Sequence, residues 1–178
     1  GARDVWFVVG LPVFLYSVLG WSFTAVGSFL ALWIIGYGFV QAAAPRLLRR
    51  SHQGSGPDGN TARLWVAVLM LLPIGIALAL QYGADPGVVI VVGLILFGFV
   101  FAVNSAVHSY LILAYADVDK VAMNVGFYYM ANAGGRLTGT VLSGLVYQQQ
   151  GLVGCLWWST SFVLVAGLLS LRLPRAAG

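Results

Sequence analysis

The sequence predicts an all-α membrane protein with six transmembrane helices. Hydrophobic residues make up 60% of its 178 residues and charged residues only 8%, whereas about 25% of the residues in soluble domains are charged. A helix needs roughly 20 apolar residues to cross a hydrocarbon core about 30 Å thick. The chain therefore has room for about six spans with short connections, and too few charges to cover a soluble globule.

Apolar segments follow one another along the chain, separated by polar turns. They predict spans at about 5–20, 25–44, 64–82, 88–115, 121–147 and 152–171. The 45–63 connection is long and polar, whereas the others are short turns at 20–22, 84–87, 117–120 and 148–151. We also expect a longer protein, because the chain begins at Gly1 and nothing before the first apolar segment resembles a signal peptide.

The basic residues predict the orientation. Those outside the spans fall at the two chain ends or in the second or fourth connection: Arg3, Arg46, Arg49, Arg50, Arg63, Lys120, Arg172 and Arg175. The connections on the opposite side contain no Lys or Arg. Because basic residues near helix ends are retained on the cytoplasmic side, both termini are expected in the cytoplasm. Basic residues placed in this way do not suggest a nucleic-acid partner.

One charged residue, Arg136, falls near the middle of a predicted span, where insertion costs roughly 2.5 to 3.5 kcal/mol. Every acidic residue lies in or beside a connection and the chain has no Glu, so we expect no carboxylate within the membrane interior. Helical spacing places Arg136 on a polar stripe that suggests a hydrated cavity; its members are Tyr129, Asn132, Arg136, Thr140, Ser143 and Tyr147.

Two interpretations of Arg136 stay open. A guanidinium suits an anionic substrate, because it matches phosphate or carboxylate in a two-pronged geometry. Alternatively, Arg136 is structural and bonds to backbone carbonyls or to a carboxylate on a half of the protein that is missing from this chain. Beside the polar stripe, small residues recur at every fourth position, which predicts a close-packing helix contact; they are Ala131, Gly135, Gly139 and Ser143.

Further polar residues lie within two other predicted spans. Asn104 and His108 are one helical turn apart in the fourth span, and His108 titrates near neutral pH. We therefore consider His108 a candidate proton carrier or substrate ligand, or a neutral histidine bonded to a neighbouring helix. Tyr37 and Gln41 are one turn apart in the second span. We interpret them either as substrate contacts or as structural residues.

Sequence motifs for enzymes, metals and cofactors are absent. The chain contains no HExxH, CxxC, Walker or GxSxG pattern. The lone Cys155 lies in an apolar run, which excludes a disulfide framework within the chain. The sequence thus favours transport over catalysis, with no cofactor and no metal.

The predicted organisation resembles the carboxyl-terminal half of a major facilitator superfamily transporter. The resemblance rests on six spans with both ends inside, a Gly-rich fifth span, and the basic stretch 45–50 (PRLLRR) after the second span. It implies two inverted three-helix repeats over 1–178, a missing amino-terminal six-helix half, and a substrate site between the halves near mid-membrane. The usual form of the basic loop motif is incomplete here.

A closer resemblance is to the ArsJ family of organoarsenical efflux permeases. It is carried by residues 3–14 (RDVWFVVGLPVF), 36–42 (GYGFVQA) and 126–137 (GFYYMANAGGRL). The resemblance implies a bacterial inner-membrane protein that exports 1-arseno-3-phosphoglycerate and so confers arsenate resistance. This substrate would form when glyceraldehyde-3-phosphate dehydrogenase uses arsenate in place of phosphate. Two alternatives remain: a major facilitator exporter of drugs or other small metabolites, and a six-span membrane scaffold without transport activity.

Overall fold

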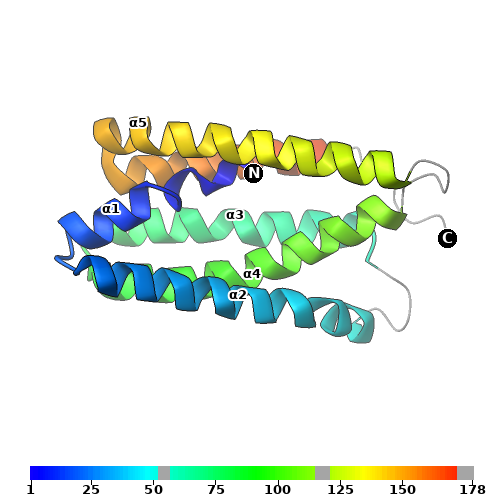
Figure 1. Cartoon of the computed structure of the whole chain (residues 1–178), viewed down its shortest axis with the longest axis horizontal. Helices are drawn as coiled ribbons and strands as arrows, with labels where there is room; N and C mark the ends of the chain where they lie inside the picture. Colours follow the sequence, from blue (N-terminus) through cyan, green and yellow to red (C-terminus); the bar gives the residue numbers. More distant parts are fainter. Residues whose placement is uncertain (52–56, 115–120, 172–178) are drawn as a thin grey trace.

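The computed structural model of the chain describes residues 1–51, 57–114 and 121–171, and this part is helical with turns. A short 3₁₀ helix precedes five α-helices: η1 (Ala2–Trp6), α1 (Gly10–Ser17), α2 (Phe23–Ser51), α3 (Gly59–Gln81), α4 (Pro86–Ala114) and α5 (Val121–Ser170). The long helices run side by side along one axis (Figure 1). Within the described residues, four helices, α2 to α5, are long and apolar enough to cross a membrane.

Helix α5 covers both the fifth and the sixth predicted spans. Its 50 residues would extend about 75 Å as one straight helix, more than twice the thickness of a hydrocarbon core. The chain instead turns at Gly151, where φ is 65° and ψ is −165°, a conformation that glycine adopts without a Cβ clash. Residues 121–150 form a first arm and residues 152–170 a second arm that runs back beside it (Figure 1).

The prediction of six full-length spans is wrong in number: the described residues form five α-helices, of which α5 covers two predicted spans, and the first predicted span is not one continuous helix. Helix α1 has only eight residues, or about 12 Å, which is too short to cross a bilayer. Residues 7–9 form a turn between η1 and α1. The chain starts midway along the bundle (Figure 1), against the backbone of Asn132 and Arg136, rather than at the bundle end where the basic-residue pattern placed it.

The long predicted connection is shorter than expected at both ends. Helix α2 continues to Ser51 and α3 begins at Gly59, so much of the predicted 45–63 loop is helical. Leu and Arg are good helix formers, and positive charge favours the carboxyl end of a helix. Asp58 caps α3 because its carboxylate accepts hydrogen bonds from the backbone N–H and the hydroxyl of Thr61, each at 2.8 Å.

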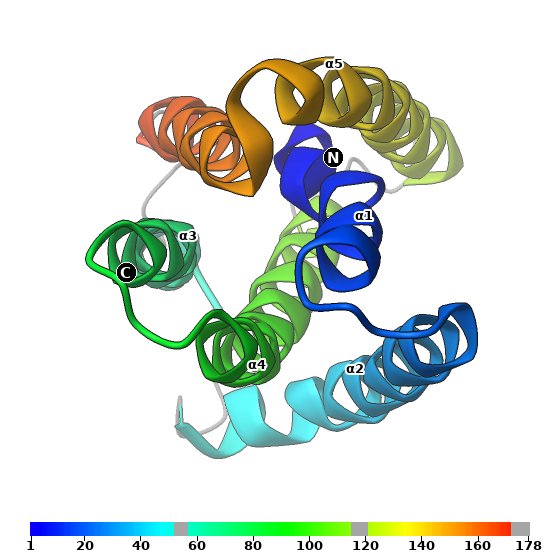
Figure 2. The same ribbon diagram turned by 90° about the vertical axis from the view of Figure 1, so that its left-hand side faces the viewer.

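Two contacts of different kinds position the helices around the bundle centre. In the first, called the glycine seam, Gly135 and Gly139 of α5 face the backbone of Gly1 and Ala2. In the second, called the aromatic seam, Trp33 and Tyr37 of α2 pack on α4 at Leu94, Gly98 and Phe101. Figure 2 shows α1 between α2 and the first arm of α5, and the described residues of α2 and α5 make no close backbone contact.

Candidate functional site

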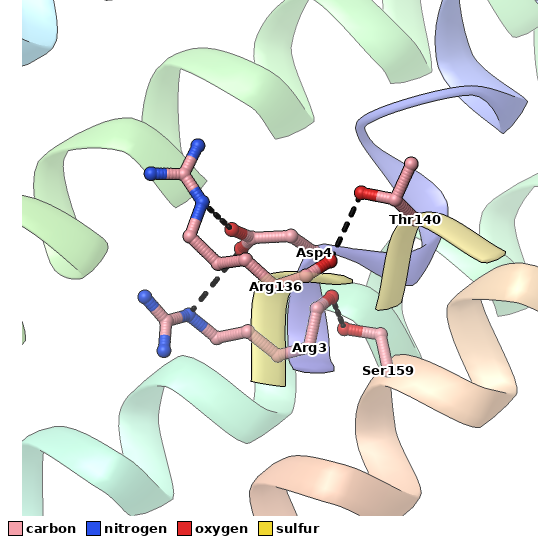
Figure 3. A network of polar contacts seen from close by, with 5 residues as sticks. All are labelled: Arg3, Asp4, Arg136, Thr140 and Ser159. Carbon is pink, nitrogen blue, oxygen red and sulfur yellow. Dashed lines mark hydrogen bonds and ion pairs between the residues drawn. The ribbon is translucent and has the colours of Figure 1, made fainter. Parts of the chain in front are cut away.

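Figure 3 shows a cluster of three charged side chains, close to the start of the chain, which lies midway along the bundle in Figure 1. Asp4 of η1 faces two arginines: Arg3 Nε is 3.8 Å from Asp4 Oδ1, and Arg136 Nε is 3.7 Å from Asp4 Oδ2. The Asp4 side chain is 13% exposed and that of Arg3 20%, whereas that of Arg136 is 65% exposed. Two cations thus share one anion, and the three side chains carry a net charge of +1.

This cluster corrects the expectation that the membrane interior contains no carboxylate. Asp4 was assigned to a connection because it precedes the first apolar residue, yet it lies in η1 against the middle of α5. Arg3, assigned to the cytoplasmic end, lies in the bundle as well. A sequence signal for this pairing existed, because Arg136 needed a partner and Asp4 adjoins an apolar segment.

The glycine seam holds η1 in the position that brings Asp4 to Arg136. A Cβ at Gly135 would lie 3.1 Å from the nitrogen of Ala2, and a Cβ at Gly139 would lie 3.0 Å from the oxygen of Ala2. Only residues without side chains allow two backbones to approach so closely. Ser159, on the second arm of α5, donates a hydrogen bond of 2.7 Å to the carbonyl of Arg3.

Ser143 anchors the next stretch of chain. Its hydroxyl oxygen accepts hydrogen bonds from the backbone N–H groups of Val9, at 3.2 Å, and Gly10, at 3.0 Å. These donors follow the turn after η1 and precede the first helical bonds of α1, where backbone N–H groups lack helical partners. Of the four predicted seam residues, Ala131 is exposed, whereas the other three contact the chain between Gly1 and Gly10.

Aromatic rings support Arg3 from the other side. The guanidinium carbon of Arg3 lies 3.9 Å from the centre of the Phe101 ring on α4, a distance typical of a cation–π contact. Phe101 stacks on Tyr37 with centroids 5.0 Å apart, and Tyr37 stacks on Trp33 at 5.7 Å. The site therefore draws on η1, α2, α4 and α5, and the sequence did not single out Phe101.

Among the described contacts, the other predicted residues of the α5 stripe make no bond to the Arg136 guanidinium. Thr140 donates its hydroxyl to the carbonyl of Arg136 at 2.9 Å. Asn132 is half-buried, and its carbonyl lies against Gly1. Tyr129 is 61% exposed and contacts the ring of Tyr128, with centroids 5.4 Å apart.

The polar residues predicted on α4 and α2 lie along the contact between these two helices. His108 Nδ1 lies 2.8 Å from the carbonyl of Asn104, so Nδ1 carries the proton and donates it to that bond. Gln41 donates to the hydroxyl of Ser105 at 3.4 Å. The buried Oδ1 of Asn104 makes no hydrogen bond within the described part of the chain. Tyr37 joins these residues to the arginine pair, because its ring stacks on Phe101, against which the Arg3 guanidinium packs.

Chemically, the guanidinium groups of Arg3 and Arg136 are cations of the kind that bind phosphate or carboxylate. Cys155 is buried and free, and in residues 1–51, 57–114 and 121–171 no three His, Cys, Asp or Glu side chains gather as a metal site. Comparisons with known families, with curated proteins and with solved structures find no match to this chain.

Proposed function

We propose that the chain is the carboxyl-terminal half of a membrane transporter that exports a small anionic solute by alternating access. The observation that carries the proposal is the net positive charge of the Arg3, Asp4 and Arg136 cluster midway along apolar helices. A guanidinium away from water needs a counter-anion, and one carboxylate cannot neutralise two. A transported anion can supply the missing charge.

The resemblance of three segments to organoarsenical efflux permeases favours one substrate, 1-arseno-3-phosphoglycerate. Its phosphate and carboxylate groups are the anions that guanidinium binds in a two-pronged geometry. Under this proposal the basic connections lie in the cytoplasm of a bacterium, and a second six-helix half closes the pathway between α2 and the first arm of α5.

The membrane potential can drive such export. Moving one negative charge out of a cell whose interior is negative releases about 2.3 kcal/mol per 100 mV. An anion carrying several charges therefore leaves downhill without a coupled proton. If protons are exchanged as well, His108 is the candidate carrier, because histidine is the side chain whose ordinary pKa lies closest to neutral pH.

The test uses cells that depend on the transporter containing this chain for arsenate resistance. Arg136→Ala should abolish resistance while leaving the amount of protein in the membrane unchanged. Arg46→Ala is the matched control, because Arg46 is an exposed arginine near the end of α2, beyond its apolar span. Full resistance of the Arg136→Ala cells would refute the anion-binding role.

A second candidate function is export of uncharged or cationic drugs, with Arg136 as a structural residue. The ion pair between Arg136 and Asp4 favours it, since a structural arginine is expected to have a carboxylate partner. In this case transport should be insensitive to an excess of phosphate-bearing anions. Competition by 3-phosphoglycerate in membrane vesicles would therefore favour the anion exporter over the drug exporter.

A further inference from the structure

Asp4 lies between the two arginines without binding either tightly. Its two oxygens face different guanidinium groups, at 3.8 Å for Arg3 and 3.7 Å for Arg136. Charge-assisted hydrogen bonds are about 2.7 to 2.9 Å long, so neither contact is one. Arg3 Nε is buried and makes no hydrogen bond within the described residues. The carboxylate therefore stays close enough to attract both cations and too far away to satisfy them.

The arginines keep their outer edges available. Both contacts with Asp4 use Nε, and Figure 3 shows the remaining guanidinium nitrogens of Arg3 and Arg136 turned to the same side, away from the carboxylate. Those nitrogens form the edge with which guanidinium grips phosphate. The Phe101 ring packs against the Arg3 guanidinium, whose carbon lies 3.9 Å from the ring centre.

We propose that Asp4 is a built-in competitor of the transported anion. This inference rests on the proposed function and adds how the site exchanges its ligand. In the empty protein the Asp4 carboxylate, which is 13% exposed, partly neutralises two guanidinium groups that repel each other. A phosphate group that binds the outer edges of both arginines takes over this neutralisation and weakens the attraction of Asp4. When the phosphate leaves, the carboxylate replaces it.

The experiment measures binding of radiolabelled inorganic phosphate to the transporter in phosphatidylcholine nanodiscs. Asp4→Asn removes the competing charge and should tighten phosphate binding by about tenfold or more, because nearby charges interact strongly at low dielectric. Asp4→Glu should weaken binding by about threefold, because its longer side chain can close the gap to hydrogen-bond distance. If the Asp4 carboxylate were needed only for folding, Asp4→Asn and Asp4→Glu would not change the phosphate affinity in opposite directions.

Asp85→Asn is the matched control, because it removes the same charge at an exposed site. The Asp85 carboxylate accepts a hydrogen bond from the N–H of Val88 at 2.8 Å, and Asn caps helices equally well. Its phosphate affinity should equal that of the wild type. Equal affinities of Asp4→Asn and the wild type, or weaker binding by Asp4→Asn, would overturn the competitor role. If Arg136→Ala then still abolished binding, the proposed function would stand, whereas absence of phosphate binding in every variant would refute both.

Discussion

The glycine seam and the aromatic seam position the charge cluster in opposite ways. In the glycine seam two backbones meet directly, so the distance between η1 and α5 is fixed without side-chain rotamers. In the aromatic seam, large rings separate α2 from α4, and Trp33 donates its indole N–H to the carbonyl of Leu94 at 2.7 Å. The first seam sets where Asp4 meets Arg136. The second provides the flat surface on which Arg3 rests.

Substitution in the glycine seam should lower the free energy of unfolding more than substitution in the aromatic seam. Gly139→Leu places a side chain against the backbone of Ala2, which cannot rotate away as a side chain could. We expect a loss of about 1 to 3 kcal/mol in the free energy of unfolding, the range for overpacked cores, and loss of phosphate binding. Gly134→Leu is the control, because a Cβ at Gly134 meets nothing within 4 Å. Equal unfolding free energies of the two variants in detergent would contradict the seam.

In the aromatic seam, adding a single methyl group should already lower the free energy of unfolding. A Cβ at Gly98 would lie 2.9 Å from the indole nitrogen of Trp33, so Gly98→Ala should displace the ring and weaken its bond to Leu94. We expect a cost of about 1 to 2 kcal/mol, measured by chemical unfolding. Gly38→Ala on α2 faces open space and should be neutral or slightly stabilising, because Ala favours helix. An unfolding free energy of Gly98→Ala equal to that of the wild type would contradict close packing of Trp33 on Gly98.

The Ser143 hydroxyl, which extends the glycine seam, should contribute less to the free energy of unfolding than the glycines do. Ser143→Ala leaves the N–H groups of Val9 and Gly10 without their acceptor, which costs about 1 kcal/mol. Ser161→Ala is matched to it, because the Ser161 hydroxyl is exposed and bonds only within its own helix, to Trp157 at 3.0 Å. The difference in unfolding free energy between the two variants isolates the anchor of α1.

The smallest effect is expected outside both seams, at the start of α3. Hydrogen bonds from the backbone N–H and the hydroxyl of Thr61 hold the pKa of Asp58 below its ordinary value of 3.8. The folded state therefore favours the ionised form, so this stabilisation is present above the ordinary pKa and is lost as the pH falls through the lowered one. Asp58→Ala should cost about 0.5 to 1 kcal/mol at neutral pH and nothing in strong acid. A cost independent of pH would contradict the capping role.

The sequence contained most of the helical organisation and part of the site. Apolar periodicity placed α2, the two arms of α5 and their turn near Gly151, because a helix in a bilayer must be long and apolar. Counting apolar residues could not reveal the turn at residues 7–9, where Ser143, distant in sequence, supplies the acceptor. Nor could it place Asp4, because proximity to an apolar segment does not say how deep a charged residue lies.

Observing the arginines themselves provides the most direct test of anion binding at mid-bundle. In the ¹⁵N-arginine-labelled protein, phosphate should shift the guanidinium signals of Arg3 and Arg136 together, each assigned by an Arg→Lys variant. The signal of Arg63, which donates hydrogen bonds to the carbonyls of Ser170 and Leu171 at 3.2 and 3.0 Å, should stay in place. Signals of Arg3 and Arg136 that do not move at saturating phosphate would contradict an anion site between these two residues.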